Sequence, residues 1–257
     1  GLNQSIAVAR SGQTLCHAGM LGAGGEPLAQ LLEGCGVDLR YLSRTETPQG
    51  HAIIQVQPDG QNCIFLYGGS NQAVTPEDID AVLSHFAPGD YLLMQNELSN
   101  FTYLLRAAVG RGLRVVLNAS PISEEVLAAD LTGVDWLVVN EIECAAIAGC
   151  STPEEGYAAL RARYPGLGIL LTLGSEGSVS WKDGAEIRQC AYPVQAVDTT
   201  GAGDTFMGYF VGCLAQGMER KDAMQYAAMA ASIAVTRPGA APSIPMMAEV
   251  RAAVEAL

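Results

Sequence analysis

The strongest constraint on the fold is a series of short apolar runs separated by segments with helical periodicity. A strand that is covered on both faces of a sheet is apolar along its whole length. Four runs have this character: 91–95, 113–118, 136–140 and 168–173. Helix-like segments lie before and between them: 75–86, 99–111, 123–130, 141–149 and 153–164. This alternation predicts an α/β fold, in which helices cover both faces of a central, mostly parallel sheet.

The two ends of the chain are expected to add further elements to this body. Near the N-terminus we expect a strand at 14–20 and a helix at 26–36. After residue 201 the chain is expected to be mostly helical, at 202–216, 220–236 and 245–256. Because no linker or repeat interrupts the sequence, we expect one domain over residues 1–257.

Two segments are expected to form hairpins. One joins 178–183 to 185–191, and the other covers roughly 51–67, where two β-rich runs flank the turn sequence "PDGQ". The second hairpin belongs to no strand–helix unit. It is therefore either a lid over a binding site or a decorative hairpin at an edge, and the sequence leaves both possibilities open.

Charge and cysteine content limit the classes of partner. The chain has 14 basic and 27 acidic side chains, a formal net charge of −13, which argues against a nucleic-acid or anionic-membrane partner. Seven cysteines without a C-x-x-C pair are typical of a reducing, cytoplasmic location. Phosphate ligands stay possible, since glycine-rich turns and helix N-termini bind anions through backbone N–H groups.

The sequence "AVDTTGAGDTF" at 196–206 has the character of such an anion site. Gly201 and Gly203 permit a tight turn, and the apolar residues after Asp204 recur at helical spacing. The unpaired N–H groups of a helix N-terminus would then face a ligand. Asp204 has two interpretations: it caps the helix, which the turn alone favours, or it takes a proton from an attacking hydroxyl.

Seven segments in the same order resemble the motifs of the ribokinase-like (PfkB-type) carbohydrate kinases. Besides "AVDTTGAGDTF", they are "GLNQSIAVARSG" (1–12), "MQNELS" (94–99), "LNASP" (117–121), "VNEIE" (139–143), "LTLGSEGS" (171–178) and "AVTRPGAAPSIP" (234–245). The resemblance spans the whole chain. It implies a three-layer sandwich with a small β lid, and an ATP-dependent kinase that phosphorylates a primary sugar hydroxyl. D-ribose, giving D-ribose 5-phosphate, is the first candidate; the alternatives are fructose, deoxyribose or a nucleoside, or a silent sugar- or nucleotide-binding protein.

The resemblance also implies roles for individual residues. Asp204 matches the catalytic base, and the N–H groups of Gly201, Ala202, Gly203 and Asp204 match the anion hole for the transferred phosphoryl group. The positions that match sugar contacts are Asn3, Glu97 and Asp204. Those that match nucleotide contacts are Asn140, Thr172, Gly174 and Gly177.

Two cations are implied in the same way. Glu143 matches a residue that organises Mg²⁺, through water. A monovalent cation, K⁺ by resemblance, would be held by Asp198, Thr200, Ala234, Arg237, Gly239 and Ser243. Members of this family usually have a further segment before the equivalent of Gly1, so we expect an N-terminally truncated chain. Lid hairpins often pair in this family, so we also expect a possible homodimer.

Overall fold

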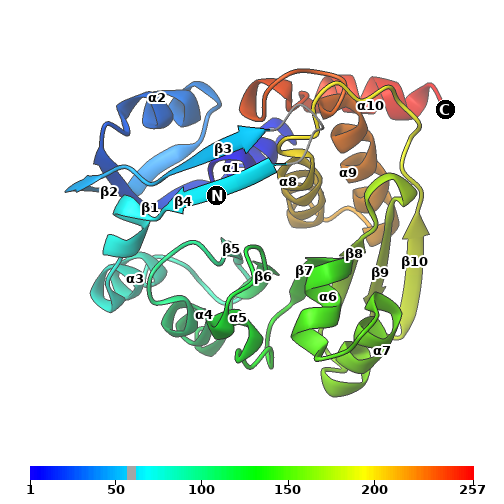
Figure 1. The fold of residues 1–257 in the computed structure, drawn as a ribbon, viewed down its shortest axis with the longest axis horizontal. Coiled ribbons are helices and arrows are strands. Elements are labelled where there is room, and N and C mark those ends of the chain that lie inside the picture. The colour runs from blue at the N-terminus through cyan, green and yellow to red at the C-terminus, as the bar shows by residue number, and fades with distance from the viewer. Residues whose placement is uncertain (57–61) are drawn as a thin grey trace.

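A computed structural model describes residues 1–56 and 62–257 (Figure 1). Its main sheet has six strands in the order β10-β9-β8-β7-β6-β5. Strands β5 to β8 are parallel, and β9 pairs antiparallel with both β8 and β10. The strands are β5 (Tyr91–Gln95), β6 (Arg114–Asn118), β7 (Trp136–Asn140), β8 (Gly168–Thr172), β9 (Ser178–Lys182) and β10 (Ala185–Gln189). The four apolar runs are therefore confirmed as the parallel strands, and the expected hairpin after residue 178 is confirmed as β9 and β10.

Helices cover both faces of this sheet. On one face lie α3 (Pro76–Leu83), α4 (Phe101–Gly110), α5 (Glu124–Leu127), α6 (Glu141–Ala148) and α7 (Pro153–Arg163). On the other face lie α1 (Leu2–Arg10), α8 (Ala202–Ala215), α9 (Arg220–Ala234) and α10 (Met247–Glu255).

The two apolar cores follow the two-residue period of the strands. In β7, Leu137 and Val139 belong to one core, whereas Trp136 and Val138 belong to the other. The second core also contains Phe210 of α8, whose ring packs edge-on against Trp136. Burial on both faces explains why these strands are apolar throughout, and it confirms the predicted three-layer arrangement.

A second, two-stranded parallel sheet lies beside the main one. It pairs β1 (Cys16–Ala23) with β2 (Asp38–Pro48), and α2 (Glu26–Gly34) connects them. The expected strand at 14–20 and helix at 26–36 are confirmed, but β2 was not predicted. Its sequence, "DLRYLSRTETP", mixes polar and apolar residues, because none of its residues is fully buried.

The expected hairpin consists of β3 (His51–Val56) and β4 (Asn62–Tyr67), which pair antiparallel. The turn expected at "PDGQ" lies outside the described residues. Ile53, Phe65 and Leu66 are each about 60% exposed. The lid role of this hairpin, and a homodimer through it, stay predictions.

Three short 3-10 turns complete the described elements: η1 (Gly69–Ala73), η2 (Gly174–Glu176) and η3 (Ala241–Ser243). In the part of the chain that the structure describes, the helices are all too short or too polar to cross a membrane.

Candidate active site

Four parallel strands each end on a polar residue, and these ends lie at one edge of the sheet. The strand termini are Gln95, Asn118, Asn140 and Thr172. Gln95 is in register with Asn118, and Asn140 with Thr172. The carboxyl edge of a parallel sheet is where α/β folds bind ligands. This edge therefore offers amide and hydroxyl groups to a polar ligand.

The glycine-rich turn leads into α8 as expected. Gly201 is the N-cap residue with φ +75°, a left-handed conformation that glycine adopts without strain. A Cβ atom there would lie 3.0 Å from the Cβ of Ala240, so the loop before η3 packs directly on this turn. Among the described residues, the N–H groups of Gly201, Gly203 and Asp204 have no hydrogen-bond partner, whereas Ala202 donates to the Thr199 carbonyl (3.2 Å). The expected anion hole thus has three free donors rather than four.

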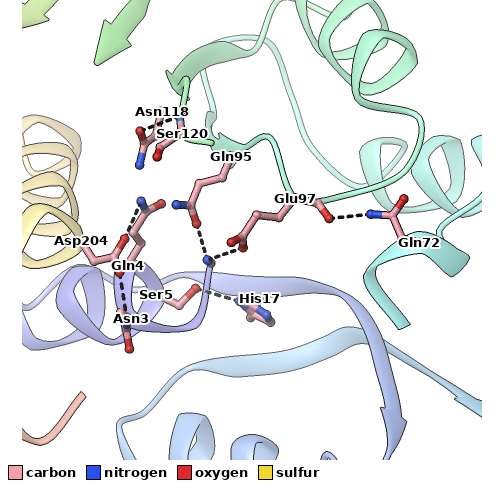
Figure 2. A network of polar contacts seen from close by, with 11 residues as sticks. Asn3, Gln4, Ser5, His17, Gln72, Gln95, Glu97, Asn118, Ser120 and Asp204 are labelled. Carbon is pink, nitrogen blue, oxygen red and sulfur yellow. Dashed lines mark hydrogen bonds and ion pairs between the residues drawn. The ribbon is translucent and has the colours of Figure 1, made fainter. Parts of the chain in front are cut away.

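Asp204 lies in the first turn of α8 but does not cap it. Its carboxylate accepts hydrogen bonds from the side-chain amides of Asn3 (to Oδ2, 2.9 Å) and Gln4 (to Oδ1, 3.0 Å). Both donors come from the first turn of α1, about two hundred residues earlier in the sequence (Figure 2). The capping interpretation of Asp204 therefore does not describe this structure. A carboxylate oxygen has two lone pairs, so each oxygen can still accept a substrate hydroxyl.

A cavity of about 1270 Å³ opens beside Asp204. It extends between β1 and the edge strand β5, and its lining includes Asn3, Gln95, Glu97 and Asp204. Figure 2 shows Glu97 and Gln95 on the β5 side, facing the first turn of α1. The backbone nitrogen of Gly1 lies against the Gln95 amide oxygen and 3.7 Å from a Glu97 carboxylate oxygen. The structure thus brings together the three expected sugar-binding residues, Asn3, Glu97 and Asp204.

Half-buried His17 is a further polar group in the wall of this cavity. Its Nδ1 lies 2.8 Å from the Ser5 hydroxyl. Desolvation is the main cause that lowers the pKa of His17 from 6.5 to about 4. The imidazole is therefore neutral at neutral pH, and Ser5 fixes its orientation.

Asn140 and Glu143 form a reciprocal capping box at the start of α6. The Glu143 N–H donates to Asn140 Oδ1 and the Asn140 N–H donates to Glu143 Oε2, both at 2.9 Å. Glu143 is only 7% exposed, so it is not the solvated helix residue that a single sequence would suggest. One of its oxygens stays without a protein partner among the described residues, and a carboxylate oxygen suits Mg²⁺, directly or through water.

The expected nucleotide loop follows β8. Thr172 donates its hydroxyl to the Val139 carbonyl (3.3 Å), which ties the end of β8 to β7. Gly174 and Gly177 both have positive φ angles, +55° and +105°. At Gly177 a Cβ would collide with the Gln189 carbonyl and lie 2.7 Å from the Ala191 nitrogen, so only glycine fits there. The loop is consequently close-packed and exposes its backbone to a ligand.

Asp198 joins the glycine-rich turn to the chain near its C-terminal end. Its two carboxylate oxygens accept hydrogen bonds from the Thr200 N–H (2.9 Å) and the Gly239 N–H (2.8 Å). Hydrogen bonds from Thr200, side chain and backbone, and then from the Gly239 N–H hold the pKa of Asp198 below its usual value. Of the six expected cation ligands, this network brings three together.

The other three expected cation ligands lie on either side of Gly239 in the sequence: Ala234 ends α9, Arg237 follows it, and Ser243 ends η3. The Ala234 carbonyl accepts from the Arg237 N–H (3.0 Å), and the Ser243 hydroxyl donates to the Ala240 carbonyl (2.7 Å). Within the described residues no group of three or more His, Cys, Asp or Glu side chains could hold a metal ion. One carboxylate with backbone carbonyls is nevertheless a set of oxygen ligands that fits a hard cation.

Gln4, Asn118 and His17 were not among the residues expected at the site, and Gln95 was expected there only as part of the segment "MQNELS". Gln95 and Asn118 could have been found, since a polar residue closes an apolar strand at the ligand-binding edge. Gln4 gives no such signal, because only its contact with a residue two hundred positions away reveals it.

Comparisons with known proteins show which family the chain resembles in sequence. A family model described as pfkB family carbohydrate kinase matches residues 1–247. A ribokinase of Arabidopsis thaliana is 34% identical over 259 residues, covering 95% of this chain and 68% of that protein. A ribokinase of Staphylococcus aureus is 32% identical over 263 residues, covering 97% of this chain and 85% of that protein.

The fold is similar to that of a solved relative. The structure of Arabidopsis thaliana ribokinase complexed with ribose and ATP matches with a TM-score of 0.84 at 32% identity, covering 99% of this chain and 86% of that one. The similarity extends over nearly the whole chain, which confirms the fold class expected from the sequence.

Proposed function

The chain belongs to the pfkB family of carbohydrate kinases, and from that premise we propose that it transfers the γ-phosphoryl group of ATP to a primary hydroxyl of D-ribose. The observation that carries this proposal is the position of Asp204. Its carboxylate lies beside unpartnered backbone N–H groups and lines the cavity that Asn3 and Glu97 also line. A proton acceptor and an anion site are thereby adjacent, as phosphoryl transfer requires.

In the proposed reaction Asp204 accepts the proton of the sugar hydroxyl as the oxygen attacks the γ-phosphorus. The bond from that phosphorus to the β–γ bridging oxygen breaks, and ADP leaves. The N–H groups of Gly201, Gly203 and Asp204 donate to the transferring phosphoryl oxygens, and the N-terminal end of α8 adds its positive potential. Asn3 and Glu97 orient the sugar, because amide and carboxylate groups together can satisfy several hydroxyls.

The nucleotide would lie along the ends of β7 and β8, against Asn140, Thr172 and the backbone of Gly174 and Gly177. When bound, Mg²⁺ neutralises phosphate charge, and Glu143 would hold it through water.

A potassium ion would be held by Asp198, Thr200, Ser243 and the carbonyls of Ala234, Arg237 and Gly239. Support comes from the hydrogen bonds that join Asp198 to Thr200 and Gly239, since a cation bound there would stiffen the turn that carries the anion hole.

The test is an ATP-consumption assay with a panel of acceptors. ADP release would be measured with D-ribose, 2-deoxy-D-ribose, D-fructose and a nucleoside, each with Mg²⁺ and K⁺ present and with a control lacking acceptor. We expect the highest kcat/KM with D-ribose, and a product phosphorylated on its primary hydroxyl. A higher kcat/KM with another acceptor would refute the choice of ribose. ATP binding without acceptor-dependent ADP release would refute the kinase reaction itself and leave a silent binding protein.

A further inference from the structure

Helices α1 and α8 pack side by side through small residues at four-residue spacing. A Cβ on Gly208 would clash with the Cβ of Ala7 and lie 2.8 Å from the Gln4 carbonyl oxygen. One turn further along, a Cβ on Gly212 would clash with the Ser11 hydroxyl. Residue numbers rise together on the two helices, so they run parallel and their first turns meet. This close contact brings the side chain of Gln4 to Asp204.

The two amides that bind Asp204 differ in their surroundings. Gln4 is only 2% exposed, and its Nε2 donates to Oδ1 of the carboxylate from within the α1–α8 contact. Asn3 is half-buried and donates to Oδ2. Both residues belong to the cavity lining, so what differs between them is their burial. Figure 2 shows the two amides approaching the carboxylate from different directions. A buried amide has no water to replace a lost partner, whereas a half-buried amide can exchange its partner for a substrate hydroxyl.

We propose that Gln4 is a positioning residue that holds the Asp204 carboxylate in its reactive orientation, while Asn3 exchanges the carboxylate for a sugar hydroxyl when substrate binds. The inference rests on the proposed kinase function. Gln4 does not touch the substrate; it acts through Asp204, whose side chain would otherwise rotate about its two single bonds. The release of Asn3 leaves Oδ2 to accept the substrate proton. The hydrogen bond from Gln4 to Oδ1 keeps Oδ2 directed into the cavity.

The same substitution at two glutamines, buried Gln4 and exposed Gln216, separates positioning of Asp204 from the loss of a hydrogen bond between the helices. Gln4→Met keeps the length of the side chain and removes its donor. Gln216→Met makes the same change at the far end of the same helix pair, where Gln216 Nε2 donates to the Ser11 carbonyl (3.1 Å). Both variants lose one hydrogen bond between α8 and α1, but only one of the bonds involves Asp204. The unfolding midpoint of each variant would be measured first.

We expect Gln4→Met to lower kcat about 10- to 100-fold, because small displacements of a catalytic group cost this much. The KM values for sugar and ATP should stay within about twofold, since Asn3, Glu97 and the expected nucleotide contacts are unchanged. Gln216→Met should retain kcat and both KM values, even if its unfolding midpoint falls equally. A kcat within twofold of the unmodified protein for Gln4→Met, or an equal loss in both variants, would overturn the positioning role.

A second variant covers the case in which Gln4→Met does not fold. Gln4→Glu is isosteric, but the carboxyl group at position 4 can donate to Asp204 only when it is protonated. The ratio of the variant's kcat to that of the unmodified protein should therefore rise as pH falls. A ratio that does not change with pH would count against positioning. Turnover by the unmodified protein and by Gln216→Met tests the kinase function separately, so failure of the inference cannot be mistaken for failure of the proposed reaction.

Discussion

Gly208→Ala is the perturbation that most directly probes the contact between α1 and α8. The added methyl would meet the Ala7 side chain and two backbone atoms of α1, the Gln4 oxygen at 2.8 Å and the Val8 nitrogen at 2.9 Å. Backbone atoms of a helix cannot move aside singly, so α1 must shift as a unit. Overpacking of this kind costs up to about 3 kcal/mol. Replacing glycine within a helix returns about 0.5–1 kcal/mol.

The net loss is therefore about 2 kcal/mol, which corresponds to a fall in Tm of roughly 4–8 °C for a chain of this size. Thermal unfolding followed by circular dichroism would measure it. The matched control is Gly110→Ala, the last residue of α4, where an added Cβ would meet nothing within 4 Å. The control should keep or raise Tm. The reasoning fails if Gly208→Ala unfolds at or above the temperature of the control.

Three further predictions concern single side chains. Asp198→Ala removes the carboxylate that joins Thr200 to Gly239, so turnover should fall and the activation of turnover by K⁺ should be lost. If kcat of the variant depends on K⁺ concentration as in the unmodified protein, the proposed cation site is wrong. Glu143→Gln should raise the Mg²⁺ concentration for half-maximal turnover while the fold is retained; an unchanged Mg²⁺ dependence would exclude Glu143 from the magnesium site. Burial keeps the folded-state pKa of His17 at about 4, below its unfolded value of 6.5. Between pH 4 and pH 6.5 the unfolded chain therefore binds more protons than the folded chain. The free energy of unfolding should therefore fall by about 3 kcal/mol as the pH falls from 6.5 toward 4. Urea unfolding of His17→Gln over the same pH range should lack this fall.

The parallel strands could be predicted from the sequence because both of their faces are buried, so nearly every position is apolar. β7 is apolar at four successive positions, since both of its faces enter a core. β2 has no such run of apolar residues. Its side chains are only partly covered, so polar residues are tolerated along it, and its pairing with β1 is visible only in three dimensions.

In the candidate site, too, the local features could be predicted from the sequence and the tertiary contacts could not. The glycine-rich turn of α8 and the capping pair at α6 are local features, and their residue types and spacing indicate what the backbone does there. The assignment of Asp204 needed more than local pattern, because an aspartate in a first turn is usually a cap. What distinguishes it is the pair of amides from α1, a tertiary contact between residues about two hundred positions apart. Gln4 was missed for the same reason.

The central claim is that the Asp204 carboxylate accepts the proton of the sugar hydroxyl. Asp204→Asn is nearly isosteric and removes the negative charge, so the measurement is the sugar-dependent rate of ADP formation by this variant beside the unmodified protein, with ATP affinity as the control. We predict a fall in kcat of about 10²- to 10⁴-fold, the usual contribution of a general base, with ATP affinity largely retained. A variant that keeps a tenth or more of the original kcat would contradict the assignment of Asp204 as the base.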